Sequence, residues 1–359
     1  MTRHWFRTAC LAVTLFATPA HADAPELVSV EKIWDRGAHN AFTDLARWRG
    51  KWYCTFREAD AHVGGDGKLR VLESADGKAW EPVALIAEEG VDLRDPKLSV
   101  TPKDQLMISA GGSVYRGTRT LMGMQPRVSF SSDGREWLAP RRVLSEGEWL
   151  WRVTWHDGKA YGAAYSPPAS RAPKSAGTGG HPPASADGEL KLYVGTDGVN
   201  YRLVTRLDVP NFPNETTLRF LADDEMVAQV RRDAGNRRGW IGRSRPPYTD
   251  WKWNEAEISL GGPNFLRLPD GSLWAAGRAT SPEGGPKTVV ARMSRDDYEP
   301  ILTLPSGGDT SYPGLAWHEG ILWMSYYSSH EGKSAIYLAK VKLPLEAKGS
   351  ARRPSLLRD

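Results

Sequence analysis

Alternation of apolar and polar residues is the dominant pattern along this chain, and it predicts antiparallel β-hairpins. Six segments alternate, break at a turn and then resume the alternation, namely residues 42–56, 97–111, 150–165, 216–230, 264–277 and 312–326. Several turns contain pairs that favour tight reversal of the chain, such as Asp157 with Gly158. Helical periodicity is nearly absent. The sequence therefore predicts an all-β protein.

A second pair of predicted strands follows each hairpin, so the chain repeats at a spacing of about 50 residues. Six such units predict a six-bladed β-propeller of four-stranded antiparallel blades, spanning residues 23–345 as one domain. The last unit has only one clear outer strand, at 334–343, and residues 27–34 form a predicted strand without a partner. Pairing these two would remove an exposed edge, so we expect the N-terminal strand to close the ring.

Three segments fall outside the repeat. Residues 1–22 combine Arg3 and Arg7 with an apolar stretch and a small-x-small site ending at Ala22, which is typical of a cleaved secretory signal. We therefore expect a secreted or periplasmic protein. Residues 167–187 are rich in Pro, Ala, Ser and Gly and predict a flexible insertion, and residues 346–359 predict a disordered polar tail.

Charge and composition narrow the expected partners. The net charge of +4 falls to +2 when Arg3 and Arg7 leave with the signal, which favours neither nucleic acid nor a membrane as partner. The eight histidines show no HxH or HxxxH spacing, and Cys54 is the only cysteine after the signal, so the sequence calls for no metal or cofactor. Fifteen tryptophans and twelve tyrosines offer faces on which sugar rings stack. A monomer that binds a glycan is the expectation.

Two predicted outer-hairpin turns share the pattern SxDGxxW, and they consist of Ser74, Asp76, Gly77 and Trp80, and of Ser131, Asp133, Gly134 and Trp137. Weaker copies are Thr196, Asp197, Gly198 and Tyr201, and Ser294, Asp296 and Tyr298. In such a turn the Asp side chain accepts backbone N–H bonds, Gly adopts a positive φ, and the aromatic ring packs beneath. These turns resemble the Asp boxes (BNR repeats) of the sialidase superfamily, which implies a structural role on the rim of a six-bladed propeller.

Charged and phenolic side chains gather at the ends of the inner hairpins, and these are Asp44, Arg57, Glu58, Asp60, His62, Arg94, Asp95, Arg152, Glu215, Arg231, Arg278, Tyr312 and Tyr326. Inner strands of a propeller converge on its axis, so we expect these side chains to face one central funnel. Five of them are arginines, which repel one another unless anions neutralise them. An acidic ligand is one explanation. Internal pairing with Asp44, Asp95, Glu58 and Glu215 is the other.

The resemblance to the sialidase superfamily, glycoside hydrolases with a tyrosine nucleophile, extends to individual residues. Glu215 in NETTLRF precedes Arg231 in AQVRRD as the family's Glu precedes an arginine of its carboxylate-binding triad. Tyr312 in SYPGL opens the last inner hairpin, as the family's nucleophile does. The resemblance implies that Glu215 withdraws the Tyr312 proton and that the phenol attacks an anomeric carbon. It also places the acid in the loop after the first hairpin, at Asp60, with Glu58 and His62 beside it.

The family's first triad arginine has no counterpart, because residues 42–45 read Phe-Thr-Asp-Leu where the family has an RIP segment. Arg57 or Arg94 would have to replace it, and Arg278 and Arg292 both fit the third triad position. Three functions follow as hypotheses. The first is a sialidase-like exo-glycosidase for a glycan with an acidic sugar, in which Tyr326 and the arginines bind substrate. The second is an inverting glycosidase that uses Asp44, Asp95 and Glu215, and the third is a carbohydrate-binding propeller without catalysis.

Overall fold

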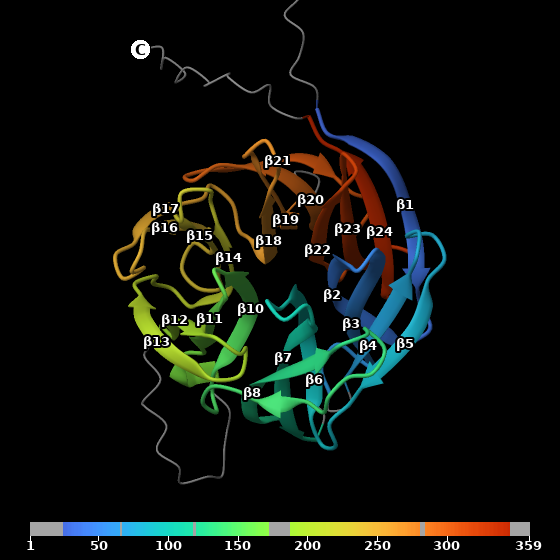
Figure 1. Cartoon of the computed structure of the whole chain (residues 1–359), viewed down its shortest axis with the longest axis horizontal. Helices are drawn as coiled ribbons and strands as arrows, with labels where there is room; N and C mark the ends of the chain where they lie inside the picture. The colour runs from blue at the N-terminus through green and yellow to red at the C-terminus, as the bar shows by residue number, and fades with distance from the viewer. Residues whose placement is uncertain (1–23, 65–66, 118–119, 172–186, 281–283, 345–359) are drawn as a thin grey trace, which may run out of the picture.

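The computed structural model describes residues 24–64, 67–117, 120–171, 187–280 and 284–344. In these ranges the chain forms six four-stranded antiparallel sheets arranged in a ring (Figure 1), so the predicted six-bladed β-propeller is confirmed. The short 3-10 turn η1 (Ala169–Arg171) is the one helical element of these ranges. The predicted signal and tail, and residues 172–186 of the predicted insertion, lie outside the described residues.

Within each blade the first strand lies nearest the centre of the ring and the last lies at the rim (Figure 1). The strands of blades 1 to 3 are β2 (His39–Trp48), β3 (Lys51–Ala59), β4 (Lys68–Ser74) and β5 (Glu81–Ile86); β6 (Asp92–Val100), β7 (Leu106–Arg116), β8 (Thr120–Ser131) and β9 (Arg141–Arg142); and β10 (Trp149–His156), β11 (Lys159–Ser166), β12 (Glu189–Gly195) and β13 (Tyr201–Leu207). Blades 4 and 5 comprise β14 (Pro213–Phe220), β15 (Met226–Arg232), β16 (Trp240–Ser244) and β17 (Lys252–Glu255); and β18 (Gly261–Arg267), β19 (Leu273–Thr280), β20 (Pro286–Met293) and β21 (Tyr298–Thr303).

Blade 6 contains both ends of the described chain. Its strands are β22 (Thr310–His318), β23 (Ile321–Ser328), β24 (Ala335–Lys342) and the N-terminal β1 (Glu26–Trp34). Strand β1 runs antiparallel to β24 along its whole length, from Glu26 opposite Lys342 to Trp34 opposite Ile336 (Figure 1). The predicted closure of the ring by the N-terminal strand is therefore confirmed, and it gives the edge of β24 a hydrogen-bonding partner.

The inner hairpins turn where the sequence predicts. In blade 1, Arg49 and Gly50 have φ values of 47° and 79°, the pattern of a two-residue type I′ turn whose twist matches that of the flanking strands. The rim turns also form as predicted from SxDGxxW. Asp76 Oδ1 accepts the N–H groups of residues 78 and 79 at 2.8 and 3.1 Å. Equivalent bonds to Asp133 are both 2.8 Å long.

Hydrophobic clusters fill the space between neighbouring blades. Cys54 lies fully buried in one that joins blades 1 and 6, together with Tyr327 and Leu338, which agrees with its prediction as a core residue. Among the described residues, no helix has the length and apolar character needed to cross a membrane. The blades therefore pack through apolar contacts around a polar centre.

A β-bulge interrupts every innermost strand close to its start. Each bulge leaves two residues outside the ladder, between the paired positions 41 and 44, 94 and 97, 150 and 153, 213 and 216, 261 and 264, and 311 and 314. Because blades repeat around the axis, all six bulges lie at the same end of the propeller. Bulges commonly re-aim side chains beside active sites. This end of the propeller holds the candidate site.

Candidate functional site

Tyr312 and Glu215 meet at the bulges of blades 6 and 4. The Tyr312 hydroxyl donates a hydrogen bond of 2.5 Å to Glu215 Oε1. Arg231 Nη1 donates to the same carboxylate oxygen at 2.8 Å and to Tyr312 Oη at 3.1 Å. Tyr312 and Glu215 are 8% and 6% exposed, so this contact is shielded from bulk water. The structure therefore brings together the three residues that the resemblance singled out.

The electrostatic environment fixes different protonation states for these two side chains. Burial alone would raise the pKa of Glu215, but the charge of Arg231 and the hydrogen bonds from Tyr312 and Arg231 outweigh it, so the pKa lies below its ordinary value. Burial and the negative charge of Glu215 raise the pKa of Tyr312 well above its ordinary value. At neutral pH the pair is therefore a carboxylate that accepts a hydrogen bond from a neutral phenol.

Gly262, in the bulge of blade 5, supports this pair directly. Its N–H donates to Glu215 Oε2 at 2.8 Å. Its φ is +58°, and a Cβ atom at this position would lie 2.9 Å from both the backbone and the ring of Tyr312. Only a residue without a side chain permits this approach at this φ. Gly262 is a site residue that the sequence analysis missed, because its role depends on a neighbouring blade.

Asp95 lies in the bulge of blade 2 with a φ of 53°. Its carboxyl group is largely buried, and within the described part of the chain its Oδ1 atom has no hydrogen-bond partner. The nearest cation is Arg94, whose Nε lies 3.9 Å from Asp95 Oδ2. Burial raises the pKa of Asp95 and the charge of Glu215 raises it further, while Arg94 and Lys97 oppose the shift. Asp95 therefore keeps its proton to higher pH than an ordinary aspartic acid.

Two cations lie beside the Tyr312 ring. Lys97 Nζ lies 4.5 Å from the centre of the Trp151 ring and 5.7 Å from that of Tyr312, and Arg278 Cζ lies 6.0 Å from the centre of Tyr312. Neither has a carboxylate oxygen within 4.0 Å among the residues that the structure describes. Burial lowers the pKa of Lys97 to about 8, although Asp95 opposes this shift. Sequence analysis placed Lys97 at a hairpin start without assigning it a role.

Arg57 was expected to bind substrate, and the structure places it elsewhere. Its side chain is fully buried, and its Nε and Nη2 atoms bond both carboxylate oxygens of Asp92, at 2.7 and 3.1 Å. Its Nη1 atom donates to the carbonyl oxygen of Ala61 at 2.7 Å. With its donors directed into the protein, Arg57 is a structural residue, and the expectation was wrong.

Asp44 and Arg152 form a second internal pair. Arg152 donates to both carboxylate oxygens of Asp44 at 2.7 and 3.1 Å, and the N–H of Leu98 donates to Asp44 at 2.6 Å. Glu58 is likewise engaged with Arg70, at 2.9 Å. Internal pairing therefore explains part of the charge at the strand ends, because these groups neutralise one another instead of facing a ligand.

Tyr326 is also placed away from the site. It lies in the core between blades, where its hydroxyl donates to the carbonyl oxygen of Pro305 at 2.8 Å and its ring stacks on Tyr337. The next residue, Tyr327, packs against Phe42 and Tyr312, with ring centres 5.5 and 5.9 Å apart. Side chains alternate between the two faces of a strand, so the prediction missed the site by one residue.

His62 and Asp60 lie in the loop after β3. His62 Nδ1 lies 2.7 Å from Asp309 Oδ2, and His39 Nε2 lies 3.2 Å from the same oxygen. His39, His62 and Asp309 are called the histidine cluster below. The Phe42 ring lies between this cluster and the Tyr312 ring, because it contacts both His62 and Tyr312. Burial opposes ionisation of Asp309, but hydrogen bonds from His39, His62 and Tyr327 hold its pKa far below the ordinary value. Asp60 is exposed.

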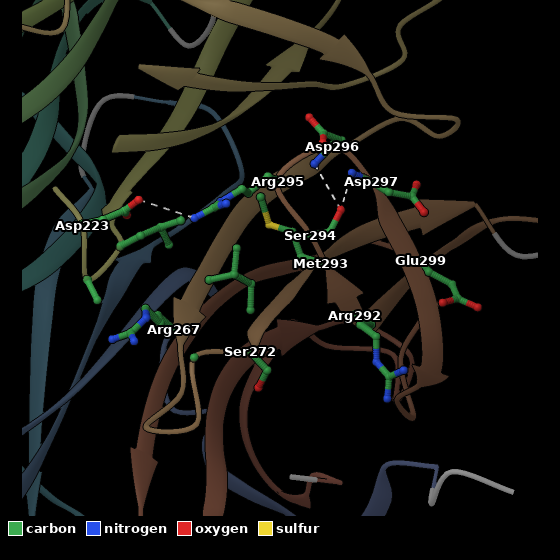
Figure 2. Close-up of a pocket in the computed structure, with 14 residues that line it drawn as sticks. Asp223, Arg267, Ser272, Arg292, Met293, Ser294, Arg295, Asp296, Asp297 and Glu299 are labelled. Carbon is green, nitrogen blue, oxygen red and sulfur yellow. Dashed lines mark hydrogen bonds and ion pairs between the residues drawn. The ribbon is translucent and has the colours of Figure 1, made fainter. Parts of the chain in front are cut away.

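Two cavities border blades 4 and 5 at opposite ends of the propeller. A cavity of about 280 Å³ is lined by Arg231 and Arg278 and thus adjoins the Tyr312 and Glu215 pair. A larger one, of about 760 Å³, lies among the hairpin turns at the other end, lined by Asp223, Arg267 and Arg295 among others (Figure 2). Because its charges of both signs are interleaved, as Figure 2 shows, the larger cavity offers no concentrated charge for a ligand.

The fold is similar to that of several solved structures. A protein of unknown function from Dyadobacter fermentans aligns with a TM-score of 0.75 at 17% identity, over 89% of this chain and 99% of the other. A GH93 α-L-arabinofuranosidase of Fusarium graminearum in complex with arabinobiose aligns with a TM-score of 0.66 at 14% identity, over 88% and 98%. A Trypanosoma rangeli sialidase in complex with sialic acid aligns with a TM-score of 0.62 at 11% identity, over 86% of this chain and 54% of the sialidase.

No protein-family model matches the chain, and no curated protein matches it in sequence. The likeness therefore concerns the fold. The six blades, with the N-terminal strand completing the last of them, form a propeller similar in fold to those of the sialidase and the arabinofuranosidase.

Proposed function

We propose that this protein is an exported glycoside hydrolase that attacks the anomeric carbon of a glycan with Tyr312, activated by Glu215. The observation that carries the proposal is the 2.5 Å hydrogen bond between the Tyr312 hydroxyl and Glu215, buried beside Arg231. A phenol is a weak nucleophile until a neighbouring base accepts its proton. Glu215 is ionised and in position to do so. The glycosidases with the same fold support the assignment to this reaction class.

The proposed reaction has two steps. In the first, Tyr312 Oη bonds to the anomeric carbon, its proton passes to Glu215, and an acid protonates the departing glycosidic oxygen. In the second, water attacks the anomeric carbon and the bond from this carbon to Tyr312 Oη breaks, while the same acid group accepts the water proton as a base and Tyr312 regains its proton from Glu215. Two displacements at one carbon retain the anomeric configuration.

Asp95 is the carboxyl group that best fits the acid. A general acid must be protonated at the working pH, and burial raises the pKa of Asp95. Its Oδ1 atom is buried and has no hydrogen-bond partner among the described residues. Asp60, implied by the resemblance, is exposed at the surface. Glu58 is held by Arg70.

The cations support an acidic sugar as substrate. Lys97 and Arg278 lie beside Tyr312 without a carboxylate partner in the described ranges, so a negatively charged group on the substrate would neutralise charge that the protein leaves unpaired. Arg94 lies over Phe42 nearby, and its guanidinium group is 3.7 Å from Asp92 and 3.9 Å from Asp95. The inverting alternative loses one of its three acids, because Asp44 is bound to Arg152.

The test is a screen of the purified protein against chromogenic α-sialosides, uronides and α-L-arabinofuranosides. Tyr312→Phe and Glu215→Gln should each lower the detected turnover by at least about 10³-fold. Tyr326→Phe, a matched tyrosine in the core, should keep it. NMR of the first-formed product should show retention. Full activity in Tyr312→Phe would overturn the mechanism, and binding of a glycan without turnover would favour a carbohydrate-binding propeller.

A further inference from the structure

The histidine cluster joins three chain segments that are distant in sequence. His39 opens β2, His62 lies in the loop after β3, and Asp309 precedes β22, with 270 positions between His39 and Asp309. The two ring nitrogens lie 3.2 and 2.7 Å from one carboxylate oxygen, and all three atoms lie within 4.8 Å of one another. Two imidazoles therefore converge on a single carboxylate.

Several contacts hold Asp309 in this position. Its other carboxylate oxygen, Oδ1, accepts a hydrogen bond of 2.7 Å from the Tyr327 hydroxyl. Its backbone N–H donates to Ser329 Oγ at 2.9 Å, and its carbonyl oxygen accepts from the Ser329 N–H at 3.0 Å. Hydrogen-bonded carboxylates of this kind are typical of metal sites, where outer contacts orient the ligating oxygen. Oδ2 is left facing the two histidines.

The two rings are fixed by packing as well. His39 and His62 meet edge to face, with ring centres 5.3 Å apart, and His62 also meets Phe42 at 5.3 Å. The side chains of His39, Asp309 and His62 are 13%, 32% and 49% exposed. The cluster is therefore supported from inside the protein and reachable by an ion from outside.

We propose that His39 Nε2, His62 Nδ1 and Asp309 Oδ2 bind a divalent transition metal ion, Zn²⁺ foremost. Two imidazoles and one carboxylate suit zinc, whose bonds of about 2.0–2.2 Å separate tetrahedral ligands by roughly 3.3 Å. The 3.2 Å separation of His39 from Asp309 matches this value, and the 2.7 Å separation of His62 from Asp309 has to lengthen by about 0.6 Å. Three protein ligands leave a fourth position for water or a substrate oxygen.

The proposed site is independent of the proposed glycosidase activity, because it includes neither Tyr312 nor Glu215. It links β22 of blade 6 to β2 and the β3–β4 loop of blade 1. An ion bound there would stabilise the contact between the first and last blades of the folded ring, since a ligand of the native state raises stability by mass action. The effect is measurable without any substrate.

A second group of possible ligands provides a matched control. His156, Asp157 and Asp224 also lie within 4.8 Å of one another, but they offer a single nitrogen. The side chains of Asp157 and Asp224 are 79% and 57% exposed. Such a group binds zinc weakly, because exposed carboxylates keep their water. A His156→Ala variant removes a comparable histidine without touching the proposed site.

The experiment titrates the chelator-treated protein with ZnCl₂ by calorimetry and with Co²⁺ by visible absorption. Wild type and His156→Ala should bind one equivalent of Zn²⁺ at the cluster and show the visible bands of low-coordinate Co²⁺. His62→Ala and Asp309→Asn should weaken binding by more than about 10-fold and lose these bands. Zn²⁺ should raise the melting temperature of wild type and not of His62→Ala.

Because His62 lies half exposed in a loop, His62→Ala keeps the test open if Asp309→Asn fails to fold. Absence of stoichiometric binding in wild type would overturn the proposal. The same follows if His62→Ala binds Zn²⁺ as tightly as wild type does. If a group at His156 were the true site, His156→Ala would lose the binding instead, which would also overturn it.

Discussion

Gly262 lies directly against Tyr312, so that a Cβ atom on Gly262 would come within 2.9 Å of the Tyr312 Cα and ring. Gly262→Ala should therefore displace Tyr312 from Glu215. We expect turnover to fall by about 10²-fold with KM little changed, since small misplacements of a reacting group have effects of this size. Steady-state kinetics on the substrate found by the screen would measure this.

Backbone strain has to be separated from this displacement, because alanine is also unfavourable at a φ of +58°. Gly158→Ala is the control, since its φ is +71° and nothing lies within 4 Å of an added Cβ atom. Gly158→Ala should lose about 1–2 kcal/mol of stability from its backbone conformation, and Gly262→Ala should lose at least as much, because it also has to displace Tyr312. Only Gly262→Ala should lose turnover, and equal turnover in both would contradict the positioning role.

Asp95→Asn should show the dependence on leaving group that identifies a general acid. The variant cannot protonate a poor leaving group, so hydrolysis of natural linkages should fall by roughly 10²–10⁴-fold. Aryl glycosides with acidic phenols need no proton and should be cleaved at a rate much closer to wild type. If Asp60→Asn shows this pattern and Asp95→Asn does not, the acid is Asp60.

The pH profile of the wild type follows from the same two carboxyl groups. Glu215 must be ionised and its pKa lies below the ordinary value, so activity should persist to low pH. Asp95 must be protonated and its pKa is raised, so the alkaline limb should lie above the range of an ordinary aspartic acid. The alkaline limb should vanish from kcat/KM in Asp95→Asn. If the decline of kcat/KM at alkaline pH stays at the same pH in Asp95→Asn, another group causes it.

Lys97 should destabilise the folded protein at neutral pH. Its pKa is 10.5 in the unfolded chain and about 8 when folded, so the folded state disfavours the ammonium form below pH 8. The cost, about 3 kcal/mol at pH 7, declines as pH rises from 8 to 10.5. Lys97→Met should therefore stabilise the protein in urea at pH 7, and by less at pH 9. The same variant should raise KM for an acidic substrate, which separates binding from stability.

Arg57 should matter for stability, because its partner Asp92 is fully buried. Arg57→Met removes the cation that bonds both oxygens of the buried Asp92 carboxylate and leaves Arg94, 3.7 Å away, as the remaining one. Breaking a buried pair in this way costs about 3–5 kcal/mol. Adding Asp92→Leu should recover most of this loss, which urea unfolding of both variants would measure. A double variant no more stable than Arg57→Met would mean that the pair is not the cause.

Features that depend on local order could be predicted from the sequence. Alternation and turn residues are properties of neighbouring positions, so the six hairpins and the closing strand were found. Glu215, Arg231 and Tyr312 were singled out through the resemblance to the sialidase superfamily, and the ends of inner hairpins converge in any propeller. Which face a side chain takes is harder to predict, because adjacent residues of a strand point to opposite faces. Tyr326 was chosen, whereas the next residue of β23, Tyr327, packs against Tyr312.

Partners contributed by other blades could not be predicted. Arg57 at a strand end looks the same in sequence whether it faces a ligand or a buried Asp92. The sequence spacing of His39 and Asp309 does not indicate that they are in contact, because this contact exists only once the ring is complete. Lys97 gains its altered pKa from burial beside Trp151, which the sequence around it does not encode.

The pairing of β1 with β24 has a consequence for biosynthesis. Of the described strands, β1 leaves the ribosome first and β24 last, so the blade that carries Tyr312 cannot be completed until the other five blades have been made. β1 therefore lacks its partner strand in this blade until β24 emerges. Blade 6, which carries Tyr312, is complete only when β1 and β24 have paired.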